Sequence, residues 1–305
     1  MNRMSLFIFL LLFACQSAEE QKETSEVDTT NEYDHPVEGT IPDRSFIEPF
    51  ERDSIKAKLQ NKIDSGEPLI VHCLVPLCDN EHQGIVPTTE SLGNGFSTRT
   101  NLYWATSNGQ KRFFERHANW KSLSLNFDPT DTILERVAFQ RKFQNEAKVI
   151  LVCDAYRGDQ MEACLDDYFA YLSGYKSSFL DLETENDLII GDEADLIAFN
   201  GHNGLMDVDI DTTYANIPRQ KDAVAIACSS RSWFNPYFLE VNAYPLVTTT
   251  NLLYPGAFIL NGIIEKWAMM DSEENIRFAA GDAYHKVKQC GQRSGRNLFA
   301  TGWGG

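Results

Sequence analysis

The chain has 305 residues, of which 44 are aspartate or glutamate and 27 are lysine or arginine, so its formal net charge at pH 7 is −17. Such an acidic chain repels the phosphates of nucleic acids and of anionic lipid headgroups, so we expect no nucleic-acid partner. Hydrophobic residues make up 43% of the sequence. This content supports a packed core, and the length suits one large domain or two small ones, of which we favour one.

The N-terminus has the organisation of a secretory signal. Arg3 supplies a positive charge, and an unbroken apolar run extends from Leu6 to Ala14. The run is shorter than the about 20 residues that cross a bilayer. We therefore expect residues 1–14 to be a signal peptide that is removed, rather than a transmembrane anchor.

The end of this run, Leu12-Phe13-Ala14-Cys15, resembles the bacterial lipobox. The resemblance implies that Cys15 becomes a lipidated N-terminus, bearing palmitate or a similar acyl chain, in a lipoprotein of the cell envelope. The protein would contact the membrane through this lipid alone. We expect it at the outer membrane or the cell surface, with the periplasmic side as an alternative. A signal peptide cleaved nearby without lipidation is the other interpretation.

Residues 15–44 are polar and acidic, with Lys22 as a lone lysine. Such a segment cannot bury a core, so we expect a solvated tether. It leaves residues 45–305 as a single domain, whose pattern is clearest after residue 147.

Helical and strand patterns alternate along this domain. Helical spacing of apolar residues predicts helices at about 53–66, 131–143, 161–172, 256–270 and 273–289. Continuous apolar runs predict buried strands at Leu69–Val75, Val149–Cys153, Leu196–Phe199, Ala223–Ala227 and Leu246–Thr249. The segment from Pro76 to about Lys121 reads as loops or short hairpins. The alternation predicts an α/β fold, a mostly parallel sheet with helices on both faces.

Two consecutive strands of this pattern end in residues that could carry chemistry. Leu196–Phe199 leads into Asn200-Gly201-His202-Asn203-Gly204, and Ala223–Ala227 leads into Cys228. In a parallel sheet ligands bind beyond the carboxyl ends of the strands. An imidazole and a thiol at neighbouring strand ends suit a cysteine nucleophile, because the thiolate reacts and an imidazolium stabilises it. Alone, each residue would more simply be a turn histidine or a buried small hydrophobe.

These two strand ends resemble those of the caspase-like cysteine peptidases of clan CD and the related CHAT domains. The likeness lies in Leu196–Gly204 and Ala223–Ser230, with support from Asn242–Thr249 and the helices after it. It implies a caspase-like three-layer sandwich in which His202 and Cys228 are catalytic. In that family the N–H of the glycine after the histidine also stabilises the oxyanion, a role that falls to Gly204.

The sequence departs from the family in two ways. Asn203 separates His202 from Gly204, and the spacing from His202 to Cys228 is shorter than the roughly 50 residues typical of caspases. A caspase-like fold that has lost its activity therefore stays open. Another stretch, Cys78–Pro87 with Asn101–Trp104, is similar to bacterial proteins of unknown role and implies no function.

A substrate pocket is expected at the same sheet edge. Asp154 ends one strand and Arg157 follows it, so an acidic pocket floor could select a basic substrate side chain. The alternative is that Arg157 pairs with a nearby carboxylate while Asp159 caps the next helix.

Metal sites are not expected, and neither is any cofactor. The segment with His72, Cys73, Cys78 and His82 lacks paired ligand spacing, and adjacent strand residues point to opposite faces. A disulfide between Cys73 and Cys78 is conceivable because an exported protein meets oxidising surroundings. The carboxylates of Asp207–Asp211 fail the EF-hand pattern and predict a strand with one polar face, with calcium as the minor alternative.

The leading functional hypothesis is thus a lipid-anchored cysteine peptidase that acts on a protein or peptide. Its rival is a non-enzymatic envelope lipoprotein that binds a protein or glycan partner. Aromatic residues could supply the binding surface or simply fill a core: Tyr103, Trp104, Phe113, Phe114 and Trp120. Another α/β hydrolase ranks last, because no Gly-x-Ser-x-Gly elbow occurs.

Overall fold

The computed structural model describes residues 49–183, 187–212 and 220–304. The expected signal peptide, Cys15 and the tether lie outside the described residues. The elements in chain order are α1 (Asp53–Ser65), β1 (Leu69–Pro76), α2 (Gln110–Arg116), β2 (Lys121–Leu123), β3 (Leu125–Asn126), β4 (Ile133–Lys142), β5 (Lys148–Tyr156), α3 (Met161–Ser173), β6 (Ser177–Leu182), β7 (Leu188–Gly191), β8 (Leu196–Asn200), the 3-10 turn η1 (Gly204–Met206), β9 (Lys221–Ile226), α4 (Ser230–Glu240), β10 (Ala243–Thr249), α5 (Ala257–Trp267), α6 (Glu273–Lys288), α7 (Gln292–Asn297) and β11 (Phe299–Ala300).

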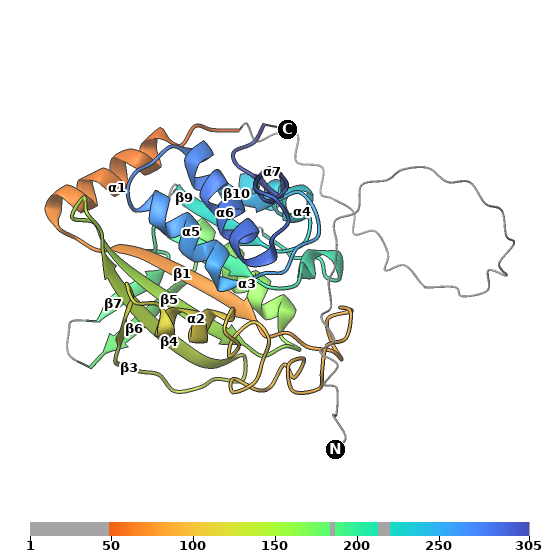
Figure 1. Ribbon diagram of the computed structural model, residues 1–305. Helices are drawn as coiled ribbons and strands as arrows, with labels where there is room; N and C mark the ends of the chain where they lie inside the picture. Colours follow the sequence, from red (N-terminus) through yellow and green to blue (C-terminus); the bar gives the residue numbers. More distant parts are fainter. Residues whose placement is uncertain (1–48, 184–186, 213–219, 305) are drawn as a thin grey trace, which may run out of the picture.

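An eight-stranded sheet in the order β11-β10-β9-β8-β1-β5-β4-β2 forms the centre of the molecule (Figure 1). Its middle strands β10, β9, β8, β1 and β5 are parallel, while β11, β4 and β2 pair antiparallel at the two sides. Every residue of β1, β8 and β9 is buried. Strands that are covered on both faces are rich in apolar residues, and for this reason the apolar runs of the sequence predicted these strands. The predicted α/β fold with a mostly parallel sheet is confirmed.

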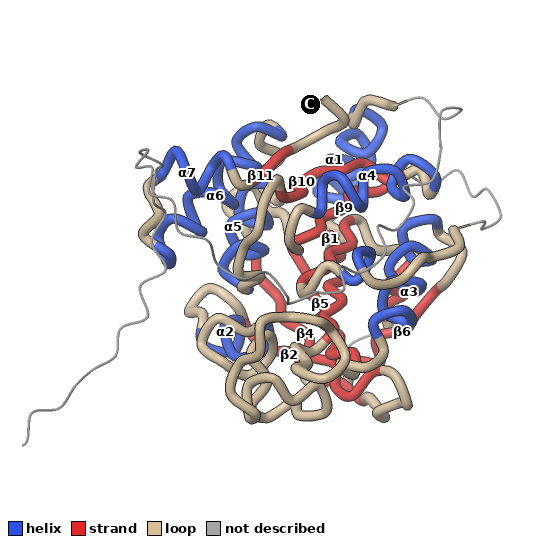
Figure 2. The backbone as a smooth tube through the Cα atoms, turned by 90° about the vertical axis from the view of Figure 1, so that its right-hand side faces the viewer, coloured by secondary structure: helices blue, strands red, loops and turns tan. Residues whose placement is uncertain are grey.

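Helices cover both faces of this sheet and make three layers (Figure 2). On one face, α1, α2, α5 and α6 pack over side chains such as Val71 and Leu151 in one apolar core. On the other, α3, α4 and the hairpin β6–β7 pack over Ile70 and Val152 in a second core. Successive strand residues point to opposite faces, so each strand feeds both cores. Within the described residues no helix is both long enough and apolar enough to cross a membrane.

The predicted helix ends follow local chemistry. Gly66 and Gly174 close α1 and α3 with φ of 80° and 78°, a left-handed conformation that glycine adopts without steric cost. Ser272 begins α6 and accepts a hydrogen bond from the Asn275 N–H, as a capping serine does.

The predicted helix over 131–143 is wrong, because this segment is the strand β4. It pairs with β5 from Ile133 to Lys142 in antiparallel register. The hydrogen bonds of a long neighbouring strand outweigh a weak helical periodicity. The expected strand Asp207–Asp211 is also wrong, because the segment follows η1 without regular structure.

The hairpin β6–β7 and helix α4 were not predicted from the sequence, and helix α2 lies in the segment that was predicted to be loops or short hairpins. In α4 the buried Phe234, Tyr237 and Phe238 lie at helical spacing, but Pro236 interrupts the pattern. Proline removes a backbone donor and disfavours a helix interior. The aromatic stripe was the signal that could have located this helix.

Candidate functional site

The strand order reverses within the parallel part of the sheet. Numbered along the chain, the five parallel strands lie in the order 2-1-3-4-5, which reverses between β1 and β8. Ligands of open α/β sheets bind at such a reversal, beyond the carboxyl ends of the strands. The loop after β8 lies against the end of β1 there, since a Cβ on Gly201 would lie 2.8 Å from Pro76 Cγ. His202 follows Gly201, so it lies beside this reversal.

The predicted pair His202 and Cys228 is brought to adjacent strand ends. β8 and β9 are parallel neighbours, and their last register pair is Asn200 with Ile226. His202 and Cys228 each follow that pair by two positions. Asn203 ties the two loops together, because its Nδ2 donates to the Cys228 carbonyl oxygen over 2.7 Å. The Asn203 side chain therefore holds the histidine loop against the backbone of the cysteine.

The imidazole of His202 is oriented by a carboxylate. Its Nε2 lies 2.6 Å from Asp207 Oδ2, and the His202 side chain is only 15% exposed. Sequence reasoning treated Asp207 as part of a strand or a calcium loop and missed this partnership. The short turn η1 brings the chain back, so that Asp207, five positions after His202, reaches the imidazole ring. A carboxylate that fixes an imidazole is the third component of many nucleophile–histidine sites.

The thiol of Cys228 is half-buried and lies at a sharp turn between β9 and α4. Its Sγ is 3.6 Å from the Leu253 carbonyl oxygen, to which it donates. The next residue, Ser229, has φ 48° and ψ 32°, a left-handed conformation that is uncommon for residues other than glycine and that clusters at functional sites. No hydrogen bond joins the Cys228 thiol to the His202 ring among the described contacts.

Gly204, the expected oxyanion donor, has a different partner. Its N–H donates to the His202 carbonyl oxygen over 3.0 Å. A Cβ at this position would lie 2.3 Å from Met161 Cγ at the start of α3. The glycine therefore allows η1 to pack on α3, and its N–H is already engaged within the loop.

Asp154 does not form the floor of an open pocket. Its side chain is fully buried, and Arg136 donates to it through Nε and Nη2 at 2.6 and 2.7 Å. His72 Nε2 lies 2.9 Å from the same carboxylate. Burial alone would raise the pKa of Asp154, but the neighbouring His72 and the Arg136 guanidinium lower it to about 2. The carboxylate is bonded internally and cannot receive a substrate side chain.

Arg157 pairs with a nearby carboxylate, which was the alternative to a role in a substrate pocket. Its Nε and Nη2 lie 2.8 and 2.7 Å from the two carboxylate oxygens of Asp159. Asp159 does not cap α3, because Gln160 occupies the cap position and makes no side-chain cap bond. The expected pairing of Arg157 is therefore present, and the expected cap is wrong.

The histidines and cysteines near β1 have separate surroundings. Cys73 and His72 point to opposite faces of the sheet. His82 Nδ1 lies 3.1 Å from Asp79 Oδ2. No cluster of three or more potential metal ligands occurs within the described ranges. Cys73 and Cys78 form no disulfide, nor do the other described cysteines. Burial raises the pKa of the Cys78 thiol to about 11, so it stays protonated near neutral pH.

The aromatic residues proposed as a binding surface belong to the core. Trp104 and Phe114 are fully buried, and Tyr103 and Trp120 are nearly so. Phe113 packs partly buried against the same cluster. Their contribution is therefore to packing.

Comparisons with known proteins add no assignment, because no protein-family model, curated protein or solved structure matches the chain.

Proposed function

We propose that the protein is a lipid-anchored cysteine hydrolase of the caspase-like peptidase type, with Cys228 as nucleophile and His202 as general base and acid. The observation that carries the proposal is the register of β8 and β9, in which His202 and Cys228 each follow the Asn200–Ile226 pair by two positions. The contact between His202 Nε2 and Asp207 Oδ2 adds an orienting carboxylate for the imidazole.

The chemistry proceeds through an acyl-enzyme. His202 takes the proton of Cys228, and Sγ attacks the peptide carbonyl carbon. The imidazolium then donates this proton to the amine as the C–N bond breaks. Water, deprotonated by His202, hydrolyses the thioester and regenerates the thiol. For attack, Sγ must leave the Leu253 carbonyl oxygen that it contacts at rest.

Active-site labelling tests this proposal. We expect an alkyne-bearing iodoacetamide at limiting concentration and neutral pH to label Cys228 fastest, and a peptide library to be cleaved. Cys228→Ala should abolish both, and His202→Gln should slow both by roughly a hundredfold or more. Asp207→Asn should slow cleavage less, because it changes only the orientation of the ring.

Cys290→Ala is the matched control, because this half-exposed cysteine lies far along the chain after α6. It should leave cleavage unchanged. Full cleavage by folded Cys228→Ala would refute the assignment. Equal labelling of Cys228 in the wild type and His202→Gln would refute the pairing of the two residues.

The second candidate is a non-enzymatic envelope lipoprotein on a caspase-like fold. The Gly204 N–H and the Cys228 Sγ both have partners within the protein, as in a site that no longer receives a substrate. This candidate predicts no cleavage by the wild type and slow, unselective labelling of Cys228.

A further inference from the structure

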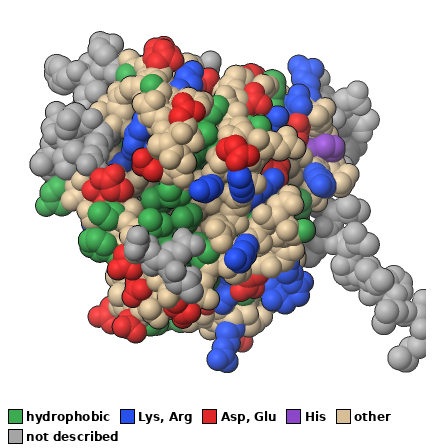
Figure 3. Space-filling model, turned by 90° about the vertical axis from the view of Figure 1, so that its left-hand side faces the viewer, with side chains coloured by type: hydrophobic (Ala, Val, Ile, Leu, Met, Phe, Trp, Pro, Cys, Tyr) green, Lys and Arg blue, Asp and Glu red, His purple; other side chains and the backbone are tan. Residues whose placement is uncertain are grey.

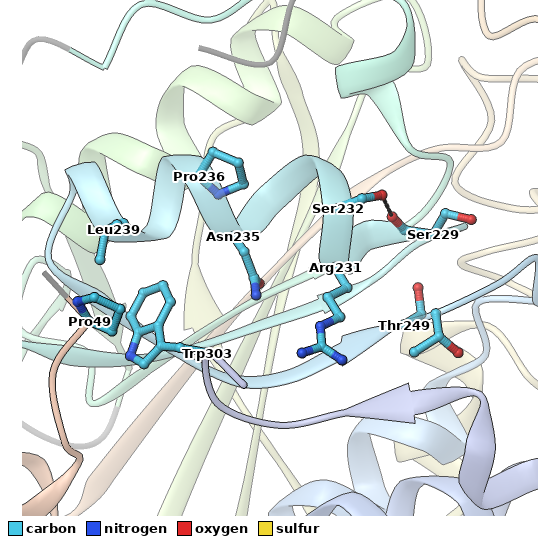
Figure 4. Close-up of a pocket in the computed structure, with 10 residues that line it drawn as sticks. Pro49, Ser229, Arg231, Ser232, Asn235, Pro236, Leu239, Thr249 and Trp303 are labelled. Atoms are coloured by element: carbon cyan, nitrogen blue, oxygen red, sulfur yellow. Dashed lines mark hydrogen bonds between the residues drawn. The ribbon is translucent and has the colours of Figure 1, made fainter. Parts of the chain in front are cut away.

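A cavity of about 570 Å³ lies between α4, the end of β10 and the C-terminal segment. Its volume falls within the range of small-ligand pockets. Arg231 and Asn235 point into it from α4, toward Trp303, with Thr249 at one side (Figure 4). No acidic side chain lines it, although acidic residues outnumber basic ones in the chain.

Two polar groups of the cavity lack partners. The Arg231 guanidinium makes no hydrogen bond or ion pair within the described part of the chain. The Oδ1 atom of Asn235 is buried and also has no hydrogen-bond partner among described residues. Buried polar atoms are nearly always bonded, and exceptions often mark the place of a ligand or water. The two residues are four apart on one helix, so they project from the same face.

The wall opposite them is rigid and apolar. Trp303 Nε1 donates to the Phe50 carbonyl oxygen over 3.0 Å, and its ring packs edge-on against the rings of Phe50 and Tyr244. A fixed indole offers contact area to an apolar side chain at little entropic cost.

The geometry points to a binding site for the free C-terminus of a peptide whose last residue is apolar. The planar fork of Arg231 suits a carboxylate. Asn235 Oδ1 can accept the amide N–H of the terminal residue, which is separated from the carboxylate by a single carbon. The terminal side chain would contact Trp303. A phosphate lacks the N–H donor and the apolar part, so it matches only Arg231.

Calorimetry of the full chain with N-acetylated Gly-Ala-Phe tests this site. We expect the free acid to bind, and the C-terminal amide and inorganic phosphate to bind roughly tenfold more weakly or not at all. Arg231→Gln should remove the preference for acid over amide. Asn235→Leu should weaken the binding of the free acid and leave any binding of phosphate unchanged. Arg231 has no described partner to lose, so its variant should unfold at the wild-type temperature.

Arg112→Gln is the matched control, since it removes one exposed arginine elsewhere on the surface, and should bind as the wild type does. Equal affinity for acid and amide, or unchanged binding by Arg231→Gln, would overturn the inference, as would phosphate binding as tightly as the peptide. The site needs no chemistry at Cys228. Binding should therefore persist in Cys228→Ala, which separates this result from the outcome for the proposed peptidase.

Discussion

Asp154 is a carboxylate enclosed by the sheet, and its ionised form is stabilised there by Arg136 and His72. Its lowered pKa links the stability of the fold to pH. A carboxyl group whose pKa is lower in the folded than in the unfolded protein stabilises the fold at any pH above its unfolded pKa, which is near 4. This stabilisation is lost as the pH falls toward the folded pKa. For Asp154 the ordinary value is 3.8, and the pKa in the folded protein is about 2.

We therefore expect the free energy of unfolding to fall by about 2 kcal/mol between pH 5 and pH 2 through this one group. Asp154→Asn should be less stable than the wild type at pH 6, because Arg136 loses its charged partner. The variant should also depend less on pH over this window. Urea denaturation at successive pH values measures both effects, and parallel curves for the two proteins would contradict the argument.

At this scale the sequence predicted where residues lie better than which partners they contact. His202 and Cys228 were expected at neighbouring strand ends because each lies just beyond an apolar run, and the register of β8 and β9 brings them there. Asp207 was missed as the partner of His202, because its approach depends on the three-residue turn η1, and a single turn has no sequence periodicity that would predict it. Arg136, the partner of Asp154, lies on a strand that was interpreted as a helix, so its contact could not be foreseen.

The loops after β1 and β5 are held together by two glycines. The Gly158 N–H donates to the Gly95 carbonyl oxygen over 2.8 Å, and a Cβ on Gly95 would lie 2.1 Å from Asp79 Oδ2 and 2.7 Å from Gly158 Cα. Gly95 lies in the segment that was predicted to be loops or short hairpins. A glycine is required there mainly because the backbone of Gly158, 63 positions later in the chain, approaches it closely.

We expect Gly95→Ala to lower the free energy of unfolding by about 1–3 kcal/mol, because the methyl group would push the two loops apart. Gly304→Ala is the control, since a Cβ there meets nothing within 4 Å. Thermal unfolding of both variants provides the test. A Gly95→Ala protein as stable as the control would show that the loops can separate without cost.

The elements that were predicted correctly are those with the strongest local signals. β1, β5, β8 and β9 each contain an apolar run, and α3 has a regular apolar stripe closed by Gly174. β4 and the hairpin β6–β7 owe their form to neighbouring strands rather than to their own pattern. Sequence periodicity could therefore locate the centre of the sheet and not its antiparallel side.

Charge on the whole molecule is mixed rather than segregated on the face seen in Figure 3. Acidic and basic side chains are interspersed there, and hydrophobic side chains gather beside them. The net charge of −17 remains an argument against binding nucleic acid. On this scale the proposed attachment to a membrane rests on the single residue Cys15.

Metabolic labelling with an alkyne fatty acid tests that attachment in a bacterial expression host. We expect the wild-type chain to be labelled and to sediment with membranes. Cys15→Ser should abolish labelling and release the protein or leave its precursor unprocessed. Cys290→Ala should behave as the wild type, and labelling that persists in Cys15→Ser would disprove the lipid site.

The first described residues are fastened to the body at two points. Arg52 bonds the fully buried Asp222 through Nε and Nη2, each over 2.6 Å, and the carbonyl oxygen of Phe50 is bonded by Trp303. If Cys15 is fixed to a membrane, a mechanical pull transmitted to Pro49 would load these two attachments of the described chain. Pro49 and Trp303 both line the cavity below α4, so such a pull would act on the wall of that cavity.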